Sequence, residues 1–204
     1  MRAADGGARL LLCVRTESEG GVRDEVLSVF TARVVKMPKI GTLTQEEYAR
    51  LARESEITKA IDMGLRLLGF SGASRVQLIE KMRQRGVKRD IAEAAVEEIC
   101  ARGYLSEAQG AENEVKKGLQ KLWGDRRILA NMRAKGYGAE ALSVAEGLLK
   151  SENAAKRCAK LIKRRRMVLP REDQEIARFV AALVRYGYAV AEIKEALREA
   201  GQLD

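Results

Sequence analysis

The sequence predicts a mainly α protein of three tandem three-helix repeats forming an elongated curved array, preceded by a small N-terminal β-hairpin or extension. The first observation is a repeat, because Gly86, Gly136 and Gly187 recur about every 50 residues, each closing the same apolar pattern. The second is composition: Ala, Leu, Glu, Lys and Arg dominate from residue 44 onward, and aromatic residues make up only 4% of the chain. A repeat array usually presents a long surface to a long partner rather than a catalytic cleft.

The repeat is clearest in three segments, 74–87, 124–137 and 175–188, which align without a gap. In each, two adjacent apolar residues and a third further on form one face of a helix that ends at the glycine. A glycine in the left-handed conformation after a helix brings together the hydrophobic pair of a Schellman motif. The predicted pairs are Val87 with Met82, Tyr137 with Met132, Tyr188 with Leu183 and, after a further helix, Tyr104 with Ile99.

The first 43 residues differ from the rest of the chain. Ala8–Arg15 and Glu25–Lys36 are rich in Leu, Val and Phe, with turn residues at 19–21 between them, which predicts a β-hairpin. Met37–Gly41 is predicted to be a linker. Thr44–Glu47 has the pattern of a capping box, in which the Thr hydroxyl and the Glu carboxylate satisfy each other's backbone amides, so a long helix should follow.

The expected helices follow from these caps and apolar stripes. They are 45–68, 74–85 and 89–102, then 106–122, 125–135 and 138–149, then 151–166, 171–186 and 189–200. The corresponding division of the chain is 1–43 for the N-terminal extension and linker, 44–105 for repeat one, 106–150 for repeat two and 151–204 for repeat three.

Composition excludes several classes of function. The chain has no histidine, which removes His-based general bases, Ser–His and Cys–His nucleophiles and most zinc sites. Cys13, Cys100 and Cys158 have no metal-ligand spacing and are expected to be reduced, mostly buried thiols of a cytosolic protein. No signal peptide or membrane-spanning stretch is visible, so a cytoplasmic location is expected. We therefore expect no catalytic site, no metal and no cofactor.

The net charge of +9 lies in residues 58–204, within the predicted helical part, because residues 1–57 carry equal numbers of basic and acidic side chains. An anionic partner is therefore expected, either nucleic acid or an acidic protein surface. Two basic clusters at equivalent positions of repeats one and two indicate one continuous basic stripe along the array. The alternative is that helix faces outside the core are simply charged, without a binding role. The candidate binding residues are Lys81, Arg83, Arg85, Lys88 and Arg89; Lys121, Arg126, Arg127, Arg133 and Lys135; and Lys163, Arg164, Arg165 and Arg166.

The densest basic run is Lys160–Arg166, for which two interpretations stay open. Its cations could neutralise several phosphates, or they could complement the negative C-terminal end of a helix dipole. Aromatic side chains for base stacking are available at Tyr104, Tyr137, Tyr188 and Trp123. The capping pattern favours a structural role for the tyrosines, and the position of Trp123 at a helix junction favours packing.

Four short strings carry a resemblance to a known family. They are Ser74-Arg75 with Leu78, Met82 and Arg85-Gly86; Gly103-Tyr104-Leu105 followed by Ala111; Arg127-Ile128 with Met132, Lys135 and Gly136; and Phe179, Leu183, Arg185 and Gly187-Tyr188. Together, over about residues 58–200, these strings resemble the RecX family, regulators of the bacterial recombinase RecA. The sequence departs from that pattern at Ser106, Glu107 and Gly110, which stand where an acidic pair and an aromatic residue are usual.

The resemblance implies a non-enzymatic modulator. Members of the family bind in the deep groove of the RecA–DNA filament, touch DNA, and block strand exchange and ATP hydrolysis or destabilise the filament. The implied partners are the RecA filament and, through accessory phosphate contacts, single- and double-stranded DNA, with no membrane. A capped array is expected to be a monomer.

A second hypothesis is a helix-turn-helix-like protein that acts directly on duplex DNA, because each three-helix unit has that outline. Against it, the segment 89–102 offers Glu93, Glu97 and Glu98 but few residues that read base edges.

Overall fold

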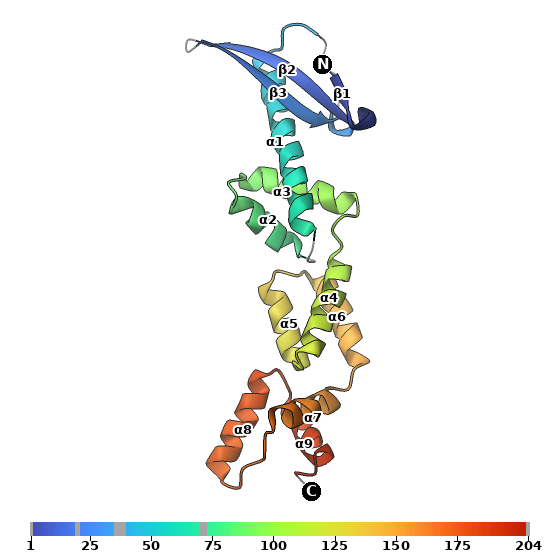
Figure 1. Ribbon diagram of the computed structural model, residues 1–204, viewed down its shortest axis with the longest axis vertical. Helices are drawn as coiled ribbons and strands as arrows, with labels where there is room; N and C mark the ends of the chain where they lie inside the picture. Colours follow the sequence, from blue (N-terminus) through green and yellow to red (C-terminus); the bar gives the residue numbers. More distant parts are fainter. Residues whose placement is uncertain (1, 19–20, 35–39, 70–72, 203–204) are drawn as a thin grey trace. The chain divides into compact units, whose positions relative to one another are not determined.

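The computed structural model describes residues 2–18, 21–34, 40–69 and 73–202 (Figure 1). These residues form two compact units, the first from 1–71 with 78–105 and the second from 72–77 with 106–204, each taken over its described part. The predicted turn at Glu19 and Gly20, the end of the predicted second strand at Lys36 and most of the predicted Met37–Gly41 linker lie outside the described residues. The division at residues 43, 105 and 150 stays a prediction.

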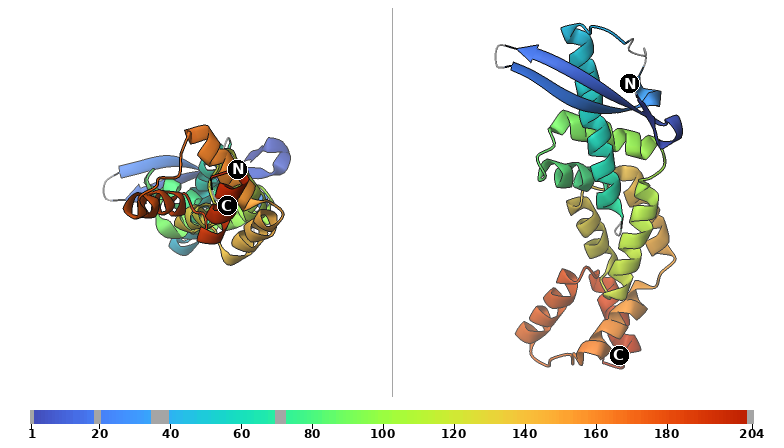
Figure 2. Two further views of the ribbon diagram at one scale, coloured as in Figure 1. Left: turned by 90° about the horizontal axis from the view of Figure 1, so that it is seen from below. Right: turned by 45° about the horizontal axis from the view of Figure 1, so that its top comes forward.

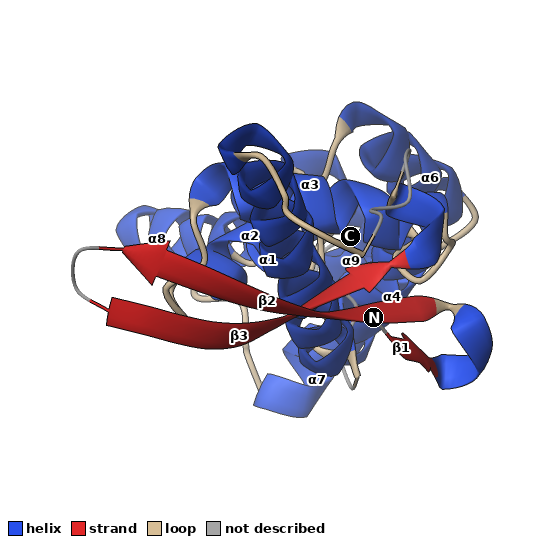
Figure 3. Cartoon of the chain, turned by 90° about the horizontal axis from the view of Figure 1, so that it is seen from above, coloured by secondary structure: helices blue, strands red, loops and turns tan. Residues whose placement is uncertain are grey.

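The N-terminal part is a three-stranded antiparallel sheet of order β1-β2-β3. Its strands are β1 (Arg2–Ala4), β2 (Arg9–Ser18) and β3 (Gly21–Phe30). The predicted hairpin is confirmed, and Figure 3 shows its two long strands running together as a twisted ribbon. The second strand lies earlier than the predicted Glu25–Lys36, because Phe30 pairs with Arg9 at the start of β2 and a 3-10 turn at Thr31–Arg33 follows.

The first helix, α1 (Gln45–Leu68), begins at the predicted capping box. The Thr44 hydroxyl accepts a hydrogen bond from the Glu47 amide at 3.2 Å, and the Glu47 carboxylate accepts one from the Thr44 amide at 2.9 Å. The strands cross α1 in the right-hand view of Figure 2. A buried apolar layer between sheet and helix contains Leu10, Leu12, Leu27, Val29 and Leu51.

Three triplets of helices follow the predicted order in the described residues, which confirms the mainly helical repeat fold. They are α1 with α2 (Arg75–Arg83) and α3 (Arg89–Ala101), then α4 (Glu107–Gln120), α5 (Asp125–Ala134) and α6 (Ala139–Lys150), then α7 (Ala154–Arg165), α8 (Asp173–Arg185) and α9 (Val190–Glu199). In each triplet the first and third helices pack side by side. The helix starts shift by one to three residues where a cap intervenes: Asn153, predicted inside a helix, instead accepts a hydrogen bond from the Lys156 amide at 2.8 Å.

Each triplet has its own hydrophobic core. Leu78, Met82 and Ile99 are fully buried in the first. At the equivalent positions Ile128 and Met132 are buried in the second, and Phe179 and Leu183 in the third. The aligned apolar residues are therefore the same structural positions repeated three times.

All four predicted Schellman motifs are present. The glycines at 86, 103, 136 and 187 have φ between +74° and +97°. The amide after each glycine donates to the predicted carbonyl, at 3.2 Å for Val87, 3.0 Å for Tyr104, 3.2 Å for Tyr137 and 3.3 Å for Tyr188. The rings of Tyr137 and Tyr188 are buried, as the structural role requires, but the Tyr104 side chain is 60% exposed. The packing role expected for the Tyr104 ring is therefore wrong.

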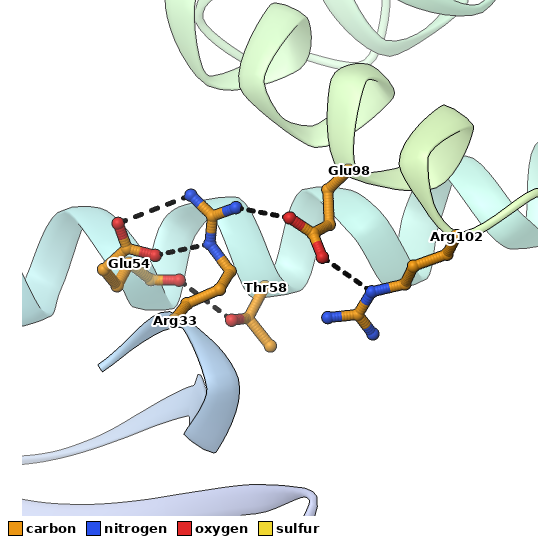
Figure 4. A network of polar contacts seen from close by, with 5 residues as sticks. All are labelled: Arg33, Glu54, Thr58, Glu98 and Arg102. Carbon is orange, nitrogen blue, oxygen red and sulfur yellow. Dashed lines mark hydrogen bonds and ion pairs between the residues drawn. The ribbon is translucent and has the colours of Figure 1, made fainter. Parts of the chain in front are cut away.

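The N-terminal sheet is joined to repeat one by a polar network at the end of β3 (Figure 4). The Arg33 guanidinium donates to Glu54 of α1 and to Glu98 of α3, each at 2.7 Å. Glu98 also accepts from Arg102 at 2.7 Å, and the hydrogen bonds from Arg102 and Arg33 hold the pKa of Glu98 below its usual value. Because one arginine ties both helices to the chain leaving the sheet, the sheet is an integral layer of the first unit.

Candidate nucleic-acid interface

The basic candidates of the first unit lie at the end of α2 and the start of α3. Three of them pair with carboxylates of the same unit: Arg83 with Glu80 at 3.1 Å, Lys88 with Glu56 at 3.9 Å, and Arg89 with Glu93 at 2.7 Å. Arg85 donates to the Lys81 carbonyl at 3.0 Å. Much of the positive charge predicted for this end of the stripe is therefore balanced within the unit.

Two candidates of repeat two also meet carboxylates. Arg133 lies 3.8 Å from Glu146. Lys135 is paired with Glu114, whose side chain is only 4% exposed and which also meets Lys117 at 3.1 Å. Because a buried carboxylate needs a charged partner, Lys135 serves the fold of repeat two.

Lys121 and Arg127 of repeat two belong to a row of alternating cations and rings that continues into repeat three, whereas the Arg126 side chain is exposed. Arg127 lies over two rings, with its guanidinium 4.5 Å from the centre of Trp123 and 5.4 Å from that of Tyr186. The Lys121 ammonium lies 4.8 Å from the centre of the Trp123 ring. The Arg165 guanidinium lies 5.8 Å from the centre of the Tyr186 ring. We call these five residues the cation–aromatic ladder. Among the described residues, none of its three cations forms an ion pair with a carboxylate.

A close backbone contact creates the ladder. The Gly124 amide donates to the Tyr186 carbonyl at 2.8 Å, and the Arg126 amide donates to the Gly187 carbonyl at 3.3 Å. A side chain at Gly124 would collide with the Gly187 backbone. Glycine at both positions therefore lets the turns touch, which brings Trp123 and Tyr186 onto one surface.

Buried polar contacts fix this joint from inside. Arg157, 6% exposed, donates to the Trp123 carbonyl at 2.8 Å and pairs with the Asp125 carboxylate. The Tyr188 hydroxyl donates to the Leu122 carbonyl at 2.8 Å, and burial raises the pKa of Tyr188. The backbone that carries the ladder is held in place before any ligand binds.

The basic run at the end of α7 is divided between two surfaces. Arg165 belongs to the ladder, whereas Lys163 and Arg166 line a groove against the end of α9, together with Lys156 and Lys160. Arg164 is exposed and belongs to neither. The sequence interpretation treated this run as one cluster and missed Tyr186, because the pairing of Tyr186 with Trp123 depends on the joint between repeats.

The described residues hold no cluster of metal-ligating side chains, and the Cys158 thiol is inaccessible. No three Cys, Asp or Glu side chains in these segments gather at a possible metal site. Cys158 is fully buried, and burial together with the nearby Glu192 raises the pKa of its thiol to about 12. No helix in the same segments is long and apolar enough to cross a membrane.

Successive three-helix repeats, each with its own core, define the class of this fold, the helical-repeat proteins. Two solved structures share the fold. A crystal structure of regulatory protein RecX matches 93% of this chain and 100% of its own, with a TM-score of 0.71 at 16% identity. RecX from Lactobacillus salivarius matches 72% of this chain and 97% of its own, with a TM-score of 0.59, also at 16% identity.

Sequence comparison gives the same family name. The chain is 29% identical to "Regulatory protein RecX" of Mycobacterium leprae over 135 residues, covering 64% of this chain and 79% of the relative. It is 27% identical to "Regulatory protein RecX" of Amycolatopsis mediterranei over 164 residues, covering 75% and 91%. No protein-family model matches the chain. In sequence and in fold, this chain is therefore similar to proteins named RecX.

Proposed function

We propose that the chain is a non-enzymatic regulator that binds the RecA–DNA filament in its groove and inhibits ATP hydrolysis and strand exchange by the recombinase. The relatives are named regulatory proteins, which supports the regulatory part of this proposal. The observation that carries it is the cation–aromatic ladder, because its cations are held in place by aromatic rings and are not paired with any described carboxylate.

The ladder suits contact with a nucleic-acid strand. Lys121, Arg127 and Arg165 provide positive charge for successive phosphates, and their binding releases counterions. The half-buried rings of Trp123 and Tyr186 hold these cations in place, so less side-chain freedom is lost on binding. A ligand of this kind inhibits by favouring the filament conformation it binds, or by occupying the place where a second DNA must enter.

Direct recognition of duplex DNA by the third helix of a repeat is the competing hypothesis. In α3, Arg89 is paired with Glu93, and Glu98 is used by Arg33 and Arg102. The face that would enter a major groove therefore lacks free side chains of the kind that read base edges.

The test is ATP hydrolysis by the host's own RecA on single-stranded DNA, titrated with this protein at two salt concentrations. We expect inhibition at near-stoichiometric protein. Lys121→Glu combined with Arg165→Glu should weaken this inhibition at least tenfold at low salt and less at high salt. Arg133→Glu reverses a charge in the same unit outside the ladder and should change the inhibition less than threefold.

Two outcomes contradict the proposal. Absence of any effect on hydrolysis and strand exchange, with tight binding to naked duplex, would favour the direct DNA-binding hypothesis. Equal losses for the ladder variant and Arg133→Glu would remove the ladder from the interface.

A further inference from the structure

Repeat three contains a second surface, a groove of about 710 Å³ between α7 and the end of α9. Its rim carries four cations, Lys156, Lys160, Lys163 and Arg166. The three lysines follow helical spacing along one face of α7, and all four side chains are exposed. None of the four is ion-paired with a described carboxylate.

The groove is also lined by apolar side chains, none of which is aromatic. Among them are Met167 and Val168, which we call its floor; Val168 is 75% exposed although its side chain is aliphatic. The acidic side chain that lines the groove is Glu199, at the end of α9. The groove therefore combines strong positive charge at its rim with exposed apolar surface inside.

The segment forming this floor is fixed to the rest of repeat three. The Met167 amide donates to the Ile162 carbonyl at 3.0 Å, closing α7. The Gln202 side chain donates to the Met167 carbonyl at 3.1 Å and accepts from the Leu169 amide at 2.8 Å. Both walls are thus held in position, which lowers the ordering cost of binding.

We propose that this groove binds an acidic amphipathic peptide segment of a partner protein. The cationic rim attracts acidic side chains, and the aliphatic floor accepts apolar ones, so a segment with acidic and apolar faces matches both. A single nucleic-acid strand fits less well, because the groove offers no ring for base stacking. Lys156 to Arg166 spans roughly 15 Å of helix, which matches a bound helical segment of about ten residues.

This proposal does not depend on DNA binding by the ladder, because the two surfaces share no residue. The basic run at the end of α7 would then serve two partners, with Arg165 on the ladder and Lys163 and Arg166 at the groove.

The experiment measures fluorescence anisotropy with the full-length protein and two labelled probes. One probe is a synthetic 14-residue helix-forming peptide with Glu on one face and Leu on the other; the second is a 12-nucleotide oligothymidylate. Lys163→Glu should weaken peptide binding at least tenfold. Its matched control is Arg164→Glu, the same charge reversal one residue further along α7, which should weaken peptide binding less than threefold.

The floor is tested by Val168→Asp, which changes an exposed side chain and should leave the fold intact. We expect it to weaken peptide binding at least fivefold, and we expect a peptide with Gln in place of Glu to bind at least tenfold more weakly. Absence of peptide binding, equal losses for Lys163→Glu and Arg164→Glu, or no effect of Val168→Asp would each overturn the proposal. Displacement of the peptide by oligothymidylate, with Lys163→Glu weakening both probes alike, would instead assign the groove to nucleic acid.

Discussion

Individual residues show where this fold accepts local strain. Leu122 and Arg166 have φ of 55° and 51°, in the left-handed region that glycine occupies after α2, α3, α5, α8 and α9. Both follow the first helix of a repeat, where the glycine pattern of the second helices does not apply. Arg166 also lines the proposed peptide groove, which gives a reason for a cation at a position that glycine would suit better.

Arg166→Gly should therefore stabilise the protein while weakening its binding. Removing the left-handed strain should raise the free energy of unfolding by about 1 kcal/mol, measured by urea denaturation. The same variant should bind the acidic peptide several-fold more weakly. A loss of stability would show that contacts of the Arg166 side chain outweigh its backbone strain.

Glu114 gives a prediction that depends on pH. Burial alone would raise its pKa, but hydrogen bonds and charge from Lys135 and Lys117 prevail and hold the pKa below its usual value of 4.5. Its ionised form therefore adds stability above pH 4.5 that is lost as pH falls through the lowered pKa. Glu114→Gln should reduce the free energy of unfolding by about 1–2 kcal/mol at pH 7.

The pH profile distinguishes this effect from simple loss of packing. The stability difference between wild type and Glu114→Gln should shrink in acid, whereas the exposed Glu112→Gln on the same helix should show almost no difference at any pH. A difference that persists unchanged into acid would mean that the charge of Glu114 contributes nothing.

At the scale of elements, the repeated glycines have two separate uses. Gly86 ends α2 with φ of +85°, and nothing lies within 4 Å of the position of an added Cβ. Gly187 has the same cap, but an added Cβ would lie 2.5 Å from the Cβ of Arg127. Within the same unit, the position of a Cβ on Gly136 lies 2.7 Å from Val76. The later glycines therefore also permit close contact with the second helix of the preceding repeat.

Alanine substitutions separate these uses. Gly86→Ala should lower the free energy of unfolding by about 1 kcal/mol, because alanine is strained in the left-handed backbone conformation. Position 124 has an ordinary extended backbone, with φ of −74°, but the side chain of Gly124→Ala would collide with Gly187. This variant should lower the free energy of unfolding by about 3 kcal/mol or more. Thermal unfolding of both variants measures the difference.

A second readout checks that the joint, and not a single helix, is affected. Gly124→Ala should expose Trp123 to solvent, which shifts its fluorescence to longer wavelength before global unfolding, and Gly86→Ala should not. Equal stability of the two variants would show that the turns can separate at little cost.

At the scale of the whole molecule, the positive charges of the N-terminal part and of the repeats differ in their partners. Arginines in and just after the N-terminal sheet form ion pairs with α1, for example Arg9 with Asp62 at 2.6 Å and Arg33 with Glu54. The net charge of +9 falls on residues 58–204, where the cations of the ladder and the groove are not paired with any described carboxylate.

This distribution predicts the salt dependence of nucleic-acid binding. If Lys121 contacts a phosphate, Lys121→Gln should lower the slope of log affinity against log salt by about 0.7 for a single strand, equally for different sequences. Arg89→Gln removes a cation already paired with Glu93 and should leave the slope unchanged. Equal changes in slope would indicate a diffuse effect of net charge.

The sequence by itself determined the helices, their caps and their threefold repetition, because capping boxes, Schellman glycines and apolar stripes act between residues only a few positions apart. Only the tertiary structure decided which cations are free, because that depends on partners far away in the chain, as with Lys135 and Glu114. The tertiary structure also decided the ladder, because its residues come together only where repeats two and three meet. It decided how the basic run of α7 is divided, because the groove forms only where α7 meets the end of α9. The sheet became a layer of repeat one for the same reason, through the long-range contacts of Arg33 with α1 and α3.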